Sequence, residues 1–112
     1  MSKQKLLKNT TSYYDELIQS LRDPEEAAAY LQVAFDEYQE DDNMEAFLLA
    51  LRNVAQAKGG ISKLATKTDL NRQSLYRTLS KSGNPKLHTL GVIIKELGFS
   101  FSITPNQPTD RG

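Results

Sequence analysis

Apolar residues recur along most of this chain at the spacing of amphipathic helices, with short polar segments between them. From Pro24 to Tyr38 they form one stripe. Asp23 and Pro24 mark a strong helix start, because aspartate accepts a hydrogen bond from an unpaired amide and proline suits the first helical position. The same reasoning predicts four more helices over residues 44–58, 62–68, 72–80 and 89–97, with Asp42 or Asn43 capping the first of these. The fold is therefore expected to be mainly α.

After Gly98 the periodicity changes from helical spacing to alternation. Phe99, Phe101 and Ile103 alternate with two serines, which predicts a short, half-buried C-terminal β-strand. A single strand needs a neighbour. We expect it to pair either with residues 12–14 or with the same strand of a second subunit.

Residues 60–79 match the spacing of a helix-turn-helix. Two short helices that cross steeply need a small residue at their contact and an apolar residue after the turn, and Ala65 and Leu70 stand at these positions. Leu75 and Leu79, four residues apart, would be the buried positions of the second helix. The expected architecture is a five-helix, lambda-repressor-like domain, and a plain helical hairpin in a bundle is the alternative.

The outward face of the second helix carries polar residues suited to a DNA major groove. Arginine pairs with guanine and glutamine with adenine in that groove. The candidates for reading bases are Arg72, Gln73, Tyr76 and Arg77. Candidates for phosphate contacts, which fix register without reading sequence, are Ser62, Lys63, Lys67, Asn71, Ser74, Ser80 and Lys81. Asp69 stands where such turns often hold glycine in a left-handed conformation, which aspartate tolerates better than most residues.

The formal net charge of zero hides a strong separation of charge. Residues 1–45 hold 4 Lys and Arg against 11 Asp and Glu, and residues 46–112 hold 10 against 3. The two parts therefore carry −7 and +7, which indicates one basic and one acidic partner. A length of 112 residues fits one domain over 13–104, with flexible tails over 1–12 and 105–112. The absence of cysteine and of an apolar signal or spanning segment favours a cytoplasmic protein away from membranes.

Composition also argues against an enzyme. The chain has no cysteine, a single histidine, His88, and no glycine-rich phosphate loop, so we expect no catalytic residues, no cofactor and no metal. His88 stands near a helix start, where capping or a surface position is the simpler explanation. Residues 40–42 are acidic but lack the spacing of a calcium loop.

The chain resembles the helix-turn-helix antitoxins known as addiction-module antidote proteins, relatives of the HigA-like antitoxins. The resemblance covers residues 14–103, and its most specific part runs from Leu75-Tyr76 to Asn84-Pro85. Asp69 and His88 depart from the family pattern, which has glycine and an acidic residue at these positions. Further matching residues are Tyr14-Asp15, Ala29-Tyr30-Leu31, Leu64-Ala65, Ser74, Leu79-Ser80, Gly83, Thr89-Leu90 and Leu97-Gly98.

The resemblance implies an antitoxin that neutralises a small toxin of the RelE/ParE kind and represses the shared operon by binding its own promoter, as double-stranded DNA, in the form of a homodimer. Such toxins are usually basic, which agrees with the acidic N-terminal part. Candidate toxin contacts are Tyr30, Phe35, Asp36, Glu37 and Tyr38, although this stripe could equally be core with solvated acids.

Two other functions stay open at this stage. A stand-alone or phage-type repressor would bind DNA in the same way without a toxin partner, and the neighbouring gene would separate the two. A protein-interaction module that no longer binds DNA is the third hypothesis, suggested by the zero net charge.

Overall fold

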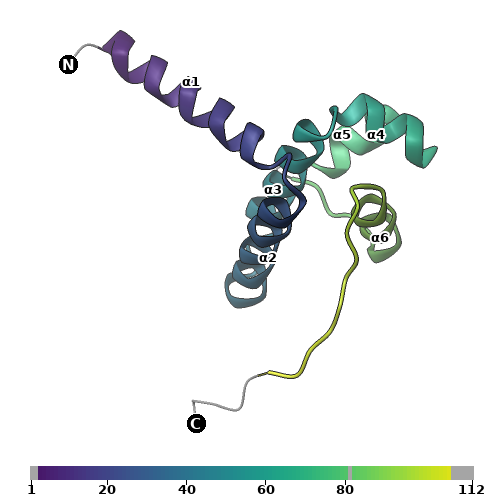
Figure 1. The fold of residues 1–112 in the computed structure, drawn as a ribbon. Coiled ribbons are helices and arrows are strands. Elements are labelled where there is room, and N and C mark those ends of the chain that lie inside the picture. Colours follow the sequence, from purple (N-terminus) through teal and green to yellow (C-terminus); the bar gives the residue numbers. More distant parts are fainter. Residues whose placement is uncertain (1–2, 81, 107–112) are drawn as a thin grey trace.

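The computed structural model describes residues 3–80 and 82–106, which form six helices and no strand (Figure 1). The helices are α1 (Lys3–Ser20), α2 (Pro24–Asp41), α3 (Met44–Ala57), α4 (Ile61–Thr68), α5 (Arg72–Thr78) and α6 (Leu87–Glu96). The expectation of a mainly α fold is confirmed.

Helix α2, which has six Asp and Glu and no Lys or Arg and is the acidic part of the body, packs against α3. Both begin as the sequence indicates: Asp23 accepts from the Glu26 amide at 3.0 Å, and Asn43 accepts from the Ala46 amide at 3.1 Å. Asp42 instead ends α2 in a left-handed conformation, with φ of 62°. The tight connection between the two helices is therefore fixed by residues 42 and 43.

The remaining helices cover the other side of α3. Helix α4 packs against α3, α5 and α6, and α5 lies beside α4 (Figure 1). The core that they share with α2 and α3 includes Leu51, Leu64, Leu75, Leu79 and Ile93, each no more than 4% exposed. Helix α3 thus lies between the acidic part and the α4–α5 pair.

The expected number of five helices is wrong for the described residues, because α1 was not predicted. Residues 9–12 of α1 are Asn, Thr, Thr and Ser, which have low helix propensity and gave no apolar periodicity. The C-terminal end of α1 is held by the fully buried Leu21 just beyond it, while its N-terminal part projects from the body (Figure 1). The division of the chain into tails at 1–12 and 105–112 and a domain at 13–104 stays a prediction.

The expected C-terminal strand is also wrong. Residues 99–106 are extended, but no described segment lies beside them as a strand, and residues 12–14 are part of α1. Only the start of the segment is anchored: the Phe99 amide donates to the Ile94 carbonyl at 3.0 Å, and the Phe101 ring lies 6.0 Å from that of Phe35. Ile103 is 98% exposed. None of the described helices is long and apolar enough to cross a bilayer.

Candidate nucleic-acid interface

The two short helices α4 and α5 are fixed to the body by the residues that the sequence marked as buried. Leu64 and Ala65 of α4 are 4% and 8% exposed, and Leu75 and Leu79 are 1% and 0% exposed. Leu70, in the turn, is half-buried and packs against the same core. The inward side of the α4–α5 pair is therefore apolar and closed.

The turn between α4 and α5 has the backbone geometry that the sequence predicts. Asp69 ends α4 with φ of 63°, which confirms the expected left-handed residue. Asn71 then caps α5, with its Oδ1 accepting from the Ser74 amide at 3.0 Å, as expected. The Thr68 hydroxyl adds a bond by accepting from the Leu70 amide at 3.3 Å. These contacts set the direction in which α5 leaves the turn.

All four residues predicted to read bases lie on the outward face of α5. Arg72, Gln73, Tyr76 and Arg77 are exposed, while Leu75 on the same helix is buried. The Arg72 guanidinium lies over the Tyr76 ring, with its carbon 5.4 Å from the ring centroid. The face therefore presents two cations, one amide and one aromatic ring to the surroundings.

The residues predicted to contact phosphates lie around this face and differ in their exposure to solvent. Ser62, Lys63, Lys67, Asn71 and Ser74 are exposed, whereas Ser80 is half-buried. The Ser80 hydroxyl donates to the Arg77 carbonyl at 2.7 Å, so it also serves the end of α5. Lys81 lies outside the described residues.

The segment after α5 contributes a feature that was not predicted from the sequence. Ser82, Gly83 and Asn84 line a shallow hollow together with Ser74, Arg77 and Thr78 of α5. A Cβ on Gly83 would lie 2.7 Å from the carbonyl carbon of Thr78 and closer still to its oxygen. Glycine is therefore required for this close approach, and the Gly-Asn-Pro run was the signal for it.

The residues predicted to contact a toxin divide into two groups on α2. The Tyr30 hydroxyl accepts from the Asn53 side-chain amide at 2.9 Å, and Phe35 packs against Phe47 with ring centroids 5.3 Å apart. Tyr38 is half-buried beside Phe35. These three aromatic residues thus serve the core. Two other members, Asp36 and Glu37, are exposed.

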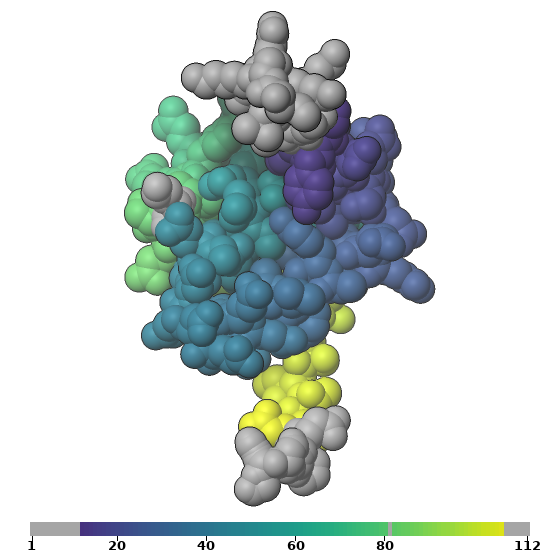
Figure 2. Space-filling model, turned by 90° about the vertical axis from the view of Figure 1, so that its left-hand side faces the viewer, coloured from purple at the N-terminus to yellow at the C-terminus, as the bar shows by residue number. Residues whose placement is uncertain are grey.

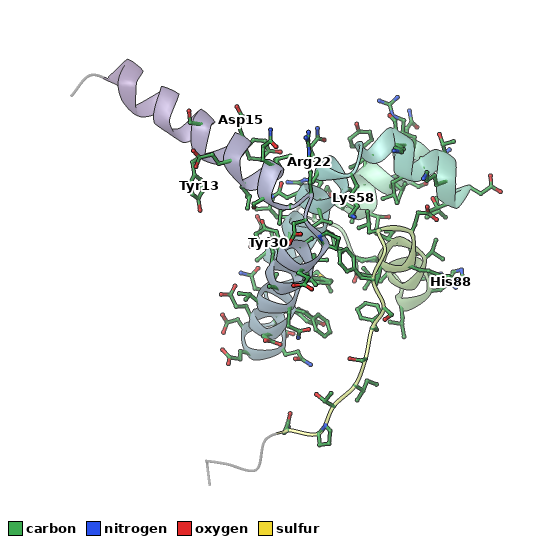
Figure 3. All side chains as sticks on the ribbon, viewed as in Figure 1. Tyr13, Asp15, Arg22, Tyr30, Lys58 and His88 are labelled. Carbon is green, nitrogen blue, oxygen red and sulfur yellow. The ribbon has the colours of Figure 1, made fainter. Side chains whose placement is uncertain are left out.

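In Figure 2 the purple surface of the C-terminal part of α1 and the green surface that follows α4 lie on opposite sides of the view. Tyr13 and Asp15 project from α1, and His88 is exposed on α6, far from them (Figure 3). Within the described residues, no three His, Asp or Glu side chains gather as a metal site would require.

A sequence model of the family described as "Probable addiction module antidote protein" matches residues 10–105. The chain belongs to this family of antidote proteins. The match spans all of α2 to α6 and most of α1, so it covers both the acidic helix α2 and the α4–α5 pair.

A relative of this antidote protein is a Haemophilus influenzae protein described only as uncharacterized. The two are 33% identical over 73 residues, which are 65% of this chain and 74% of the relative. No solved structure matches the chain. An antidote implies a toxin as its partner.

Proposed function

We propose that this antidote protein is a DNA-binding antitoxin of the HigA-like kind, which neutralises a RelE/ParE-type toxin and represses the promoter of its own operon. In this proposal α4, the turn and α5 are a lambda-repressor-like helix-turn-helix. The observation that carries it is the division of α5: Leu75 is buried, while Arg72, Gln73, Tyr76 and Arg77 are exposed together. A helix with this division fits a major groove and presents its first turns to base edges.

Basic residues around α5 would supply the sequence-independent part of binding. Lys63 and Lys67 are exposed on α4, and Arg77 is exposed at the end of α5. Each phosphate that such a cation neutralises releases counterions, so affinity should fall steeply with salt. The zero net charge does not oppose this, because the negative charge is concentrated in residues 1–45 and the positive charge in residues 46–112.

A homodimer is part of the proposal. One α5 of seven residues reads only a few base pairs. Dimers of such domains place two reading helices on half-sites about 34 Å apart, or a multiple of this, so the operator is expected to be an inverted repeat.

The toxin is proposed to be a basic protein that docks on the outward face of α2. Between Asp23 and Leu51 the chain has 9 Asp and Glu and no Lys, Arg or His. Asp36 and Glu37 are exposed on this face, next to Val33, an apolar side chain that is 58% exposed. Opposite charge accelerates the encounter of two proteins, and an exposed apolar residue among acids suits a protein partner.

Neutralisation in this scheme takes place in the cytoplasm and requires binding alone, without catalysis or a cofactor. The test is to express the protein with the product of the gene next to its own. The proposal expects rescue of growth, a complex that copurifies, and a gel shift of the upstream duplex. A gel shift without rescue or complex would indicate a stand-alone repressor. Rescue without any gel shift would indicate an interaction module.

A further inference from the structure

Two neighbouring residues of α3 make the only side-chain hydrogen bonds that join different elements in the described part of the chain. Arg52 Nη1 donates to the Leu79 carbonyl at 2.8 Å, and Asn53 Nδ2 donates to the Tyr30 hydroxyl at 2.9 Å. The first bond reaches the end of α5, and the second reaches α2. Adjacent side chains of α3 thus bond to α2 and to the end of α5.

The bond from Arg52 gives a donor to a carbonyl at the C-terminal end of α5. The last carbonyls of a helix lack intrahelical partners, and a cation at that end also interacts favourably with the helix dipole. In the segment after α5, the Ser80 hydroxyl donates to the Arg77 carbonyl and the Gly83 amide donates to the Ser80 carbonyl. The Leu79 carbonyl receives its donor from α3 instead.

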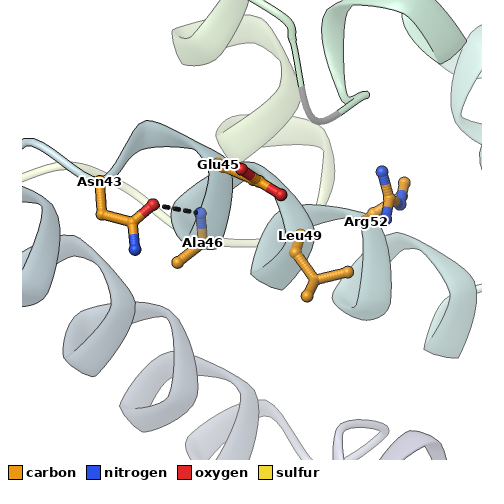
Figure 4. Close-up of a pocket in the computed structure, with 5 residues that line it drawn as sticks. All are labelled: Asn43, Glu45, Ala46, Leu49 and Arg52. Atoms are coloured by element: carbon orange, nitrogen blue, oxygen red, sulfur yellow. Dashed lines mark hydrogen bonds between the residues drawn. The ribbon is translucent and has the colours of Figure 1, made fainter.

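Arg52 is well placed to hold this bond. Its side chain is half-buried, and Leu79 is fully buried, so an unpaired carbonyl there would be costly. Figure 4 shows Arg52 on α3, further along the helix than the Asn43 cap, where it lines a surface hollow together with Glu45 and Leu49. Its bond to the Leu79 carbonyl places its guanidinium at the end of α5.

We infer that Arg52 is a positioning residue for DNA reading: by holding the Leu79 carbonyl it fixes the tilt of α5 against α3, and so the placement of Arg72, Gln73 and Arg77 on base edges. This inference rests on the proposed function of α5. Helix α5 has only seven residues and is anchored by Leu75 and by its C-cap Leu79, so a hydrogen bond that holds the Leu79 backbone acts directly on its orientation. A small misplacement of a reading helix weakens base contacts more than phosphate contacts, so it reduces affinity for the correct sequence more than affinity for unrelated sequences.

The experiment compares three variants of the full-length protein, Arg52→Met, Arg52→Lys and Asn53→Ala. Arg52→Met removes the donor and keeps most of the aliphatic part of the side chain. Arg52→Lys keeps a cation and a donor. Asn53→Ala removes the neighbouring bond to α2 and is the matched control. Binding is measured by fluorescence anisotropy to a duplex of the upstream region and to a scrambled duplex of the same composition. Amide hydrogen exchange is measured on the free proteins.

The inference expects Arg52→Met to lower the ratio of the two affinities roughly five- to tenfold, about the size of one lost base contact, with partial recovery in Arg52→Lys. Asn53→Ala should lower thermal stability and leave the ratio unchanged. Exchange of the Leu79 amide should accelerate in Arg52→Met and not in Asn53→Ala.

Two results would overturn the inference. One is an unchanged ratio in Arg52→Met; if both duplexes are weakened equally, Arg52 is a direct phosphate contact. The other is an equal fall of the ratio in Asn53→Ala, which would indicate general loss of structure. A wild-type protein without any sequence preference would instead overturn the proposed function, and the Leu79 exchange rate would still decide whether Arg52 holds α5.

Discussion

The Arg72 guanidinium lies over the ring of Tyr76, one helical turn further along α5, with 5.4 Å between its carbon and the ring centroid. Both side chains are exposed, so the contact limits the motion of Arg72 without burying it. Such a contact contributes about 0.5–1 kcal/mol at an exposed site. Tyr76 was predicted to read a base, and this geometry gives it a second role, since it can orient the arginine that reads.

The two roles of Tyr76 separate in a pair of variants. Tyr76→Phe keeps the ring and should bind the upstream duplex about as well as the wild type. Tyr76→Leu removes the ring and should weaken binding about two- to fivefold. Anisotropy titrations measure both. Equal losses in the two variants would show that the hydroxyl itself makes the important contact.

Gly83 and Gly91 form a natural comparison for the loop after α5. Gly83→Ala places a methyl group against the backbone of Thr78 and should lower the free energy of unfolding by about 1–3 kcal/mol. Gly91→Ala in α6 meets no atom within 4 Å and should raise it by about 0.5–1 kcal/mol. Urea unfolding tests both changes. A Gly83→Ala protein as stable as the wild type would contradict the close approach.

Asp69 carries a conformational cost and a charge, and different substitutions separate them. Asp69→Ala should lower the free energy of unfolding by roughly 1 kcal/mol, because alanine at φ of 63° is strained, whereas Asp69→Gly should not lower it. Asp69→Asn tolerates the conformation and removes the charge, so it should strengthen binding to all duplexes alike. Sequence-dependent strengthening in Asp69→Asn would mean that this side chain faces bases.

The proposed toxin surface on α2 is tested by reversing its charge. Asp36→Lys with Glu37→Lys should slow association with the product of the neighbouring gene about tenfold or more at low salt, because the attraction becomes a repulsion. Stopped-flow measurements give the rate. Glu96→Lys, an exposed charge change on α6, is the control. Glu96→Lys changes the net charge by half as much, so a slowing about half as large on a logarithmic scale would show that net charge, and not the α2 face, controls the encounter.

Helical periodicity and capping residues were sufficient to predict α2 to α6 within a few residues. Asp23, Asn43 and Asn71 cap where expected because each side chain bonds within its own helix end, which sequence spacing reveals. The left-handed Asp69 was predictable for the same local reason.

Features that depend on neighbours distant in sequence were not predicted. The stripe on α2 left open whether Tyr30 and Phe35 face the core or a partner, and the structure shows that they contact Asn53 and Phe47 of α3. Alternation at 99–103 predicted a strand, but strand formation needs a pairing partner that the described residues do not supply. The bond from Arg52 to Leu79 joins residues 27 positions apart, and no local pattern indicates it.

Sequence reading by the outward face of α5 is tested by comparing Arg72→Ala with Lys63→Ala on the upstream duplex and on single-base variants of it. We expect Arg72→Ala to weaken binding to the upstream duplex by about 1–3 kcal/mol and to relax the preference at one base pair, and Lys63→Ala to weaken binding to every duplex alike. Equal, sequence-independent losses from both substitutions would contradict it.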